Sequence, residues 1–192
     1  DSYGRYLDSD NDGICYRTYP GTHPEKGAYF TRGTSHDEYA RYTEDGNINA
    51  ETLMRLMRKF RTASELVPPP IIEINGEDSC GIIYYGSSKP AVLEAKDILK
   101  TKDINVDLMQ IRSFPFNLDV WEFIASHDRI YVVEQNRDSQ MRTLIMAEGG
   151  ISAEILRPLV HFTGDPIEAS YIVNKISERE VNYKSHKNIK ER

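Results

Sequence analysis

The chain has few cysteines and no long apolar run, and each absence excludes a class of protein. Its 192 residues include two cysteines, Cys15 and Cys80. They do not form a Cys-x-x-Cys pair, so this chain alone cannot build an iron–sulfur cluster or a zinc knuckle. We interpret both as small apolar residues, and two free thiols fit a reducing cytoplasm. No stretch approaches the roughly 18 apolar residues that span a bilayer, and no signal peptide is visible, so we expect no membrane partner.

Positive charge is not in excess either. The formal net charge is −6 at pH 7, which makes the whole chain a poor ligand for nucleic acid phosphates. Hydrophobic residues make up 39% and charged residues 28%, a balance typical of soluble globular proteins. The first residue is Asp1 rather than Met, and we therefore expect the chain to be part of a longer protein.

Three segments of the chain differ in their hydrophobic pattern. Residues 1–46 show no sustained hydrophobic period, which predicts long ordered loops. Apolar residues recur at three- and four-residue steps over 47–67, which predicts a helix that ends at the three prolines Pro68, Pro69 and Pro70. We therefore expect three parts: residues 1–70 as irregular loops plus one helix, 71–178 as a second domain, and 179–192 as a polar tail outside any core.

Residues 71–178 alternate between strand and helix patterns. Strands separated by helices in this rhythm predict an α/β fold with a mostly parallel, Rossmann-like sheet and helices on both faces. The expected strands are Cys80–Tyr85, Val106–Ile111, Arg129–Glu134 and Leu159–Phe162. The expected helices are one containing Ala91, Val92, Ala95, Ile98 and Leu99, then Leu118–Ala125, residues 137–148, and Ile167–Ile176.

Two loop motifs have both a binding and a structural interpretation. Asp8–Gly13 has the oxygen spacing of the first half of a calcium loop. However, Tyr19 stands where an EF-hand needs its bidentate Glu, and such segments also form turns without an ion. Gly86–Pro90 links a strand to a helix and could offer amides to an anion. It lacks the phosphate-loop and dinucleotide fingerprints, so a tight turn is the alternative.

Two further clusters are candidates for function. Arg17 and Thr18 lie in one loop motif, and Arg32 and His36 in another; arginines can bind a carboxylate through forked hydrogen bonds, and His can exchange protons near neutral pH. Solvated loop charges are the alternative. The second cluster follows a strand, at the edge where ligands and partners meet in open α/β sheets. We predict an interface there, with surface capping as the alternative, at Glu134, Gln135, Asn136 and Arg137.

Six segments, taken in order, resemble the alpha subunit of 2-oxoacid:ferredoxin oxidoreductases, and the 2-oxoglutarate type most. Together they extend over roughly residues 3–176. They are Asp12–Thr22, Ala28–Asp45, Gly86–Ser88, Ser113–Phe116, Val132–Met141 and His161–Pro166.

The resemblance implies a fold, a reaction and partners. Residues 71–176 are similar to the transketolase C-terminal domain, and residues 1–67 resemble the end of the pyrimidine-binding domain with its connection. In such enzymes a 2-oxoacid is decarboxylated on thiamine diphosphate, its acyl group passes to coenzyme A, and electrons leave through an iron–sulfur cluster to ferredoxin. The diphosphate and Mg²⁺ motif and the cluster cysteines are absent here, so the resemblance implies a beta subunit that holds these cofactors and a chain that is inactive alone.

We expect Arg17, Thr18, Arg32 and His36 to contact the substrate, with Arg17 as the first candidate because its guanidinium can bind a carboxylate. The alternative is that Arg17 only braces its loop against an acidic residue of the preceding turn, Asp8, Asp10 or Asp12. Two other classes of function stay open. One is an interaction module that keeps the fold without catalysis. The other is a different thiamine enzyme, such as a transketolase or an E1-type dehydrogenase, which the segment 28–45 disfavours.

Overall fold

The computed structural model describes residues 3–27, 35–76 and 80–190. The chain divides into two compact units, one up to Val67 and one from Pro68 onward.

The first unit consists of irregular loops held against one helix, α1 (Gly46–Leu66). Asp45 caps the helix, because its carboxylate accepts the backbone N–H of Asn47 at 2.8 Å. Val67 ends the helix and the prolines follow. The sequence predicts this helix to within a residue at each end.

The loops of this unit contact the polar face of α1 rather than its apolar face. Arg55, Arg58 and Thr62 hydrogen-bond to residues of the segment 8–13. On the other side, three large apolar residues of α1 are more than half exposed: Leu53, Met57 and Phe60. An apolar face of a helix normally packs against a core. In this unit the apolar face of α1 is exposed, as it would be at a subunit interface.

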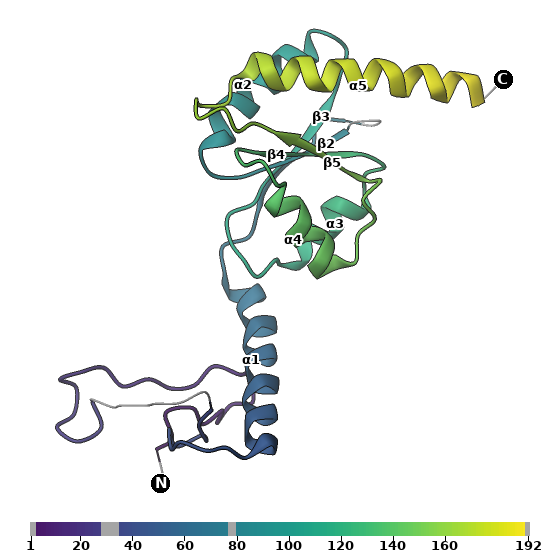
Figure 1. Ribbon diagram of the computed structural model, residues 1–192. Coiled ribbons are helices and arrows are strands. Elements are labelled where there is room, and N and C mark those ends of the chain that lie inside the picture. The colour runs from purple at the N-terminus through teal and green to yellow at the C-terminus, as the bar shows by residue number, and fades with distance from the viewer. Residues whose placement is uncertain (1–2, 28–34, 77–79, 191–192) are drawn as a thin grey trace. The chain divides into compact units, whose positions relative to one another are not determined.

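The second unit is built on a five-stranded sheet (Figure 1). Its strands lie in the order β1-β3-β2-β4-β5. The pairs β3–β2, β2–β4 and β4–β5 are parallel, and β1 is antiparallel to β3. The strands are β1 (Ile71–Glu73), β2 (Cys80–Tyr84), β3 (Val106–Gln110), β4 (Ile130–Glu134) and β5 (Leu156–Val160).

Helices cover both faces of this sheet (Figure 1). Alternate strand residues pack on α2 (Lys89–Lys100) and α5 (Ala169–Lys190) on one face, for example Ile82 with Val92 and Ile172. The intervening residues pack on α3 (Leu118–Ala125) and α4 (Gln140–Gly149) on the other face, for example Ile83 with Phe123 and Ile145. A short 3-10 turn, η1 (Gly86–Ser88), precedes α2. The predicted α/β class, with a mostly parallel sheet and helices on both faces, is confirmed.

Two elements differ from the sequence prediction. Strand β1 is not predicted, because it has three residues and forms only by pairing with β3, which lies distant in the sequence. The last helix continues to Lys190, through most of the segment that the sequence assigns to a polar tail. Within that segment Glu180 is polar yet only 2% exposed, so the segment is not outside the core as predicted.

Glu180 is buried because it pairs with groups of two strands. Its carboxylate accepts hydrogen bonds from Arg129 at 2.8 Å and from the Tyr131 hydroxyl at 2.8 Å. Arg157 also reaches the Tyr131 hydroxyl, at 3.3 Å. A buried carboxylate is tolerated when charged and neutral donors surround it in this way, so this network holds α5 on the domain at Glu180. Within the part of the chain described, no helix combines the length and apolarity that membrane crossing requires.

Candidate functional site

The loop at residues 8–13 folds as a structural turn against α1. The Asp8 carboxylate accepts the Gly13 N–H at 2.9 Å and the Arg58 guanidinium at 2.8 Å. Burial raises the pKa of Asp8, but the hydrogen bonds from Arg58 and Gly13 outweigh it, so the pKa is lowered overall. Asp12 accepts the Ile14 N–H at 2.7 Å. Both carboxylates are therefore engaged within the chain, which favours the turn over a calcium loop.

A cavity of about 320 Å³ lies between this turn, the following loop and α1. Among the described residues its lining includes four cations and no acid. The cations are Arg5, Arg17, Arg55 and Lys59. Four positive charges around one small space make it a candidate site for an anion.

The four cations differ in how the protein holds them. Arg5 donates to the Thr18 carbonyl oxygen at 3.2 Å, and Arg55 donates to the Gly13 carbonyl oxygen at 3.0 Å. The side chains of Arg17 and Lys59 make no hydrogen bond or ion pair with any residue that the structure describes. These two charges are therefore available to a ligand.

Cys15 also lines this cavity and is partly buried. Burial raises the pKa of its thiol most, and the charges of Asp8 and Asp12 raise it further, while the charges of Arg55 and Lys59 oppose the rise. The balance is a raised pKa, so Cys15 is a protonated thiol at neutral pH and a poor nucleophile. We assign it no chemical step.

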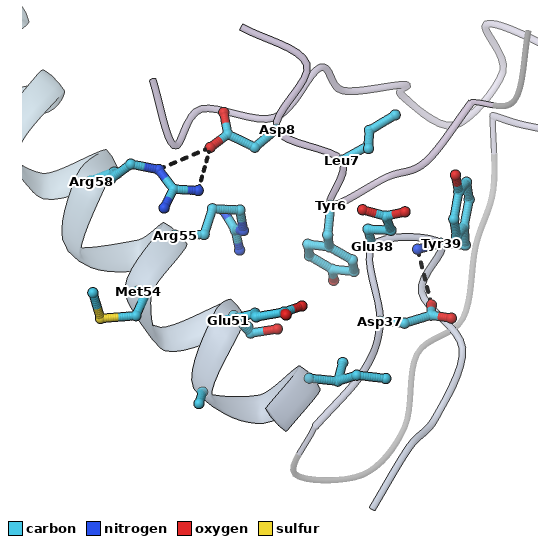
Figure 2. A pocket seen from close by; sticks show the side chains of 13 residues that line it. Tyr6, Leu7, Asp8, Asp37, Glu38, Tyr39, Glu51, Met54, Arg55 and Arg58 are labelled. Atoms are coloured by element: carbon cyan, nitrogen blue, oxygen red, sulfur yellow. Dashed lines mark hydrogen bonds and ion pairs between the residues drawn. The ribbon is translucent and has the colours of Figure 1, made fainter. Parts of the chain in front are cut away.

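A second cavity of about 700 Å³ lies beside the first and shares Tyr6 and Arg55 with it. Figure 2 shows its acidic residues, among them Glu38 and Glu51, together with the Arg58–Asp8 ion pair. Its charges are mixed and Arg58 is already paired. It is therefore a weaker candidate for an anion site than the smaller cavity.

The structure separates the predicted substrate residues. Arg17 lines the small cavity. Thr18 lies outside its lining, and its hydroxyl donates to the Lys26 carbonyl oxygen at 2.7 Å, which braces the loop. His36 is outside the lining too, but its ring stacks on Tyr6 with centroids 3.8 Å apart and so supports a lining residue. Arg32 lies outside the described residues.

Sequence reasoning misses Arg5, Arg55 and Lys59. Arg55 and Lys59 are four residues apart on one helix, a spacing that places both on the same face. That spacing could have indicated a cationic face. It did not identify a site, because the loop that completes the cavity has no periodic pattern.

The predicted interface at the carboxyl end of β4 is partly an internal network. The Glu134 side chain is fully buried, and its carboxylate accepts the backbone N–H groups of Met141 at 2.7 Å and Arg142 at 3.0 Å. The Asn136 amide donates to the same carboxylate at 2.8 Å. The expectation that Glu134 lies in an interface is therefore corrected: this carboxylate holds the N-terminus of α4, where a negative charge is favoured by the helix dipole.

The neighbours of Glu134 are more accessible. Gln135 and Arg137 are exposed, and Asn136 is half-buried. Gln135 donates to the Ser87 hydroxyl at 3.0 Å and accepts the Ile167 N–H at 3.2 Å. Gln135 thus ties the turn before α2 to the segment before α5. Arg137 pairs with the adjacent Asp138 at 2.7 Å, with both side chains largely in solvent.

No set of residues for a metal or cluster emerges. Across residues 3–27, 35–76 and 80–190 there is no group of three or more His, Cys, Asp or Glu that could hold a metal ion. Cys80 lies in the core at 0% exposure, and burial raises its pKa to about 12. An iron–sulfur cluster needs four protein ligands, usually cysteines, and Cys15 and Cys80 are two separate thiols, so the residues described do not fit such a cluster.

No protein-family model matches the chain. Curated relatives do match, and two of them are alpha subunits. The "2-oxoacid:ferredoxin oxidoreductase 2, subunit alpha" of Aeropyrum pernix is 28% identical over 185 residues, which are 92% of this chain and 28% of that protein. The "2-oxoacid:ferredoxin oxidoreductase subunit alpha" of Saccharolobus solfataricus is 28% identical over 124 residues, which are 62% of this chain and 20% of that protein. The chain thus spans less than a third of the length of each relative.

A solved structure is similar as well. The 2-oxoglutarate:ferredoxin oxidoreductase from Magnetococcus marinus, with 2-oxoglutarate, coenzyme A and succinyl-CoA bound, matches with a TM-score of 0.77 and 23% identity. The match covers 93% of this chain and 31% of that one, and at this identity it supports the fold. The curated relatives agree with the six sequence motifs: by sequence, the chain is a relative of the alpha subunits of 2-oxoacid:ferredoxin oxidoreductases.

Proposed function

We propose that the chain works as part of a cytoplasmic, thiamine diphosphate-dependent 2-oxoacid:ferredoxin oxidoreductase. In the proposed reaction a 2-oxoacid is oxidatively decarboxylated, the acyl group passes to coenzyme A, and ferredoxin takes the electrons. The observation that carries the proposal is the cationic cavity around Arg17, in a chain related to alpha subunits of such enzymes. The role of the chain is to bind the substrate and to contact a partner subunit.

Arg17 is suited to the carboxylate beside the reacting carbonyl. A carboxylate that enters a closed site must be paired, since burying it unpaired is costly. The guanidinium stays charged and can bind both carboxylate oxygens. Because 2-oxoglutarate is bound in the Magnetococcus marinus enzyme, we propose it as the substrate.

In this proposal the cofactors are bound mainly by another subunit. Thiamine diphosphate, Mg²⁺ and the iron–sulfur cluster would be held mainly by the beta subunit. The described residues supply no set that fits the metal or the cluster. When bound, thiamine diphosphate supplies the chemistry that decarboxylates the 2-oxoacid.

Two surfaces support work in an assembly. Leu53, Met57 and Phe60 leave an exposed apolar stripe on α1, and surfaces of this kind are typical of interfaces. At the end of β4, we keep Gln135, Asn136 and Arg137 as proposed interface residues, because each is at least partly accessible. Glu134 would act behind them by holding α4 in place.

The test is an assay of the complete subunit assembly. Ferredoxin reduction is measured with 2-oxoglutarate, pyruvate and branched 2-oxoacids, with and without coenzyme A and thiamine diphosphate. Activity that needs both cofactors and a 2-oxoacid supports the proposal. An assembly that forms and binds its partner, yet oxidises no 2-oxoacid, would favour the non-catalytic interaction module.

Arg17→Met is the variant for the site, and Arg61→Met is its matched control. Arg61 is an exposed arginine of α1 that lines neither cavity. Loss of a charged hydrogen bond to the substrate costs about 2–3 kcal/mol, so kcat/KM should fall roughly 30- to 150-fold in the Arg17 variant. Equal values of kcat/KM in the two variants would remove Arg17 from the substrate site.

A further inference from the structure

The small cavity has more positive charge than one carboxylate can neutralise. Arg17 comes from the loop after the 8–13 turn, and Lys59 comes from α1. Neither side chain has a hydrogen-bond or ion-pair partner among the residues described. Arg55 adds a third positive charge, and its bond to the Gly13 carbonyl oxygen uses only one of its donors.

A ligand that enters this space displaces water from all of these cations. With one negative charge on the ligand, Arg17 would be paired and Lys59 would be left partly desolvated without a counter-charge, which is unfavourable. A second negative group on the ligand removes that cost. The charge of the site therefore favours a ligand with two anionic groups over a ligand with one.

The volume of the cavity limits the size of the ligand that can bind there. About 320 Å³ lies at the lower end of the range of roughly 300–1,000 Å³ for small-molecule pockets. A small dicarboxylic acid suits such a space, whereas a nucleotide-containing thioester carrier exceeds it. The neighbouring larger cavity offers no better site for the second anion, because its lining includes Asp37, Glu38 and Glu51.

We infer that Lys59 is a specificity-determining residue that binds the distal carboxylate of a dicarboxylic 2-oxoacid, while Arg17 binds the carboxylate beside the carbonyl. Arginine matches the planar carboxylate that every 2-oxoacid shares. Lysine is a point charge on a flexible stem, and it suits a carboxylate whose position varies with the length of the acid. This inference rests on the proposed function, and it deepens it by naming the residue that selects the substrate class.

The first test compares substrates in the complete assembly. Lys59→Met keeps the length of the side chain and a good helix former while it removes the charge. We expect kcat/KM for 2-oxoglutarate to fall about 10- to 100-fold, mainly through KM. For monocarboxylic 2-oxoacids kcat/KM should rise, because the variant removes a charge that those substrates leave desolvated and unpaired. Lys59→Arg should restore most of the loss, and Arg61→Met should behave as the wild type.

The second test measures ligand binding in the absence of turnover. Cys15 lines the same cavity, so a bound ligand should slow its alkylation by iodoacetamide, measured by mass spectrometry. Glutarate has two carboxylates and no carbonyl beside them, and we expect it to protect Cys15 at concentrations at which butyrate does not. Lys59→Met should abolish the difference between the two acids.

The outcomes separate the two ideas. If Lys59→Met lowers kcat/KM equally for mono- and dicarboxylic substrates, or leaves the protection by glutarate intact, the assignment of Lys59 is overturned. If the wild-type assembly oxidises no 2-oxoacid, the proposed function fails, whereas selective protection by glutarate would still support a dicarboxylate site. Thermal unfolding of each variant, matched to the wild type, shows that the effects are local.

Discussion

Gly13 lies directly against the backbone of α1 at Lys59. A Cβ atom placed on Gly13 would collide with the Lys59 backbone nitrogen and stand 2.7 Å from the Arg55 carbonyl oxygen. The backbone of Gly13 also has φ of +83°, in the region that favours glycine. The same residue thus sets the distance between the loop and the two helix residues that contribute charge to the small cavity.

Gly13→Ala should therefore disrupt the first unit. Both the positive φ and the backbone contact oppose a methyl group, so we expect a destabilisation of about 2 kcal/mol or more. Gly21→Ala is the control, because Gly21 has φ of +85° but nothing within 4 Å of an added Cβ. Limited proteolysis and thermal unfolding of the complete subunit compare the two variants. Equal effects would mean that the contact with α1 contributes nothing.

Glu134→Gln tests the carboxylate that holds α4. A glutamine keeps the shape, but its NH₂ group would face one of the N–H groups of Met141 and Arg142, both of which donate to the carboxylate now. We expect a loss of about 1–3 kcal/mol in the free energy of unfolding. Glu148→Gln, at an exposed position of the same helix, should change it little. Urea unfolding measures both, and a stable Glu134 variant would contradict the role given to this side chain.

Disrupting the network around Glu180 should lower the free energy of unfolding more than Glu134→Gln does. Glu180→Ala removes the carboxylate that pairs with the buried Arg129 and accepts the Tyr131 hydroxyl. Breaking a buried ion pair from one side costs about 3–5 kcal/mol. Glu178→Ala, at an exposed position of α5, is the control. Hydrogen exchange should show faster exchange of residues 177–183 in the Glu180 variant alone, and unchanged exchange there would exclude the network as the anchor of α5.

The success of sequence reasoning follows the range of the interactions involved. Strands β2 and β4 are predicted, as Cys80–Tyr85 and Arg129–Glu134, because apolar runs of this length are themselves the signal. Strand β1 depends on a partner strand, and the helix beyond Ile176 depends on Glu180 meeting Arg129. Neither dependence appears as a local pattern.

The candidate site follows the same rule. Arg17 is predicted from a motif in its own loop, whereas Lys59 becomes a candidate only when Gly13 brings that loop against α1. Glu134 shows the opposite error. A polar residue after a strand suggests an accessible edge, but the turn that follows folds back and buries it under the start of α4.

The two cysteines should differ in reactivity, in a direction set by their surroundings. Cys80 is fully buried with a pKa raised to about 12, so it should resist iodoacetamide until the protein unfolds. Cys15 is partly accessible, and its pKa is raised by burial against the opposing charges of Arg55 and Lys59. Since the thiolate is the reactive form, its alkylation should be slow at pH 7 and should accelerate as the pH rises through 9 and above.

Lys59→Met removes a charge that favours the thiolate of Cys15, so the pH at which alkylation accelerates should move upward. Peptide mass spectrometry across a pH series follows each cysteine separately, with Arg61→Met as the control. A Cys15 rate at pH 7 equal to that of an unfolded peptide, or a shift in the opposite direction in the Lys59 variant, would show that the thiol does not lie among these charges.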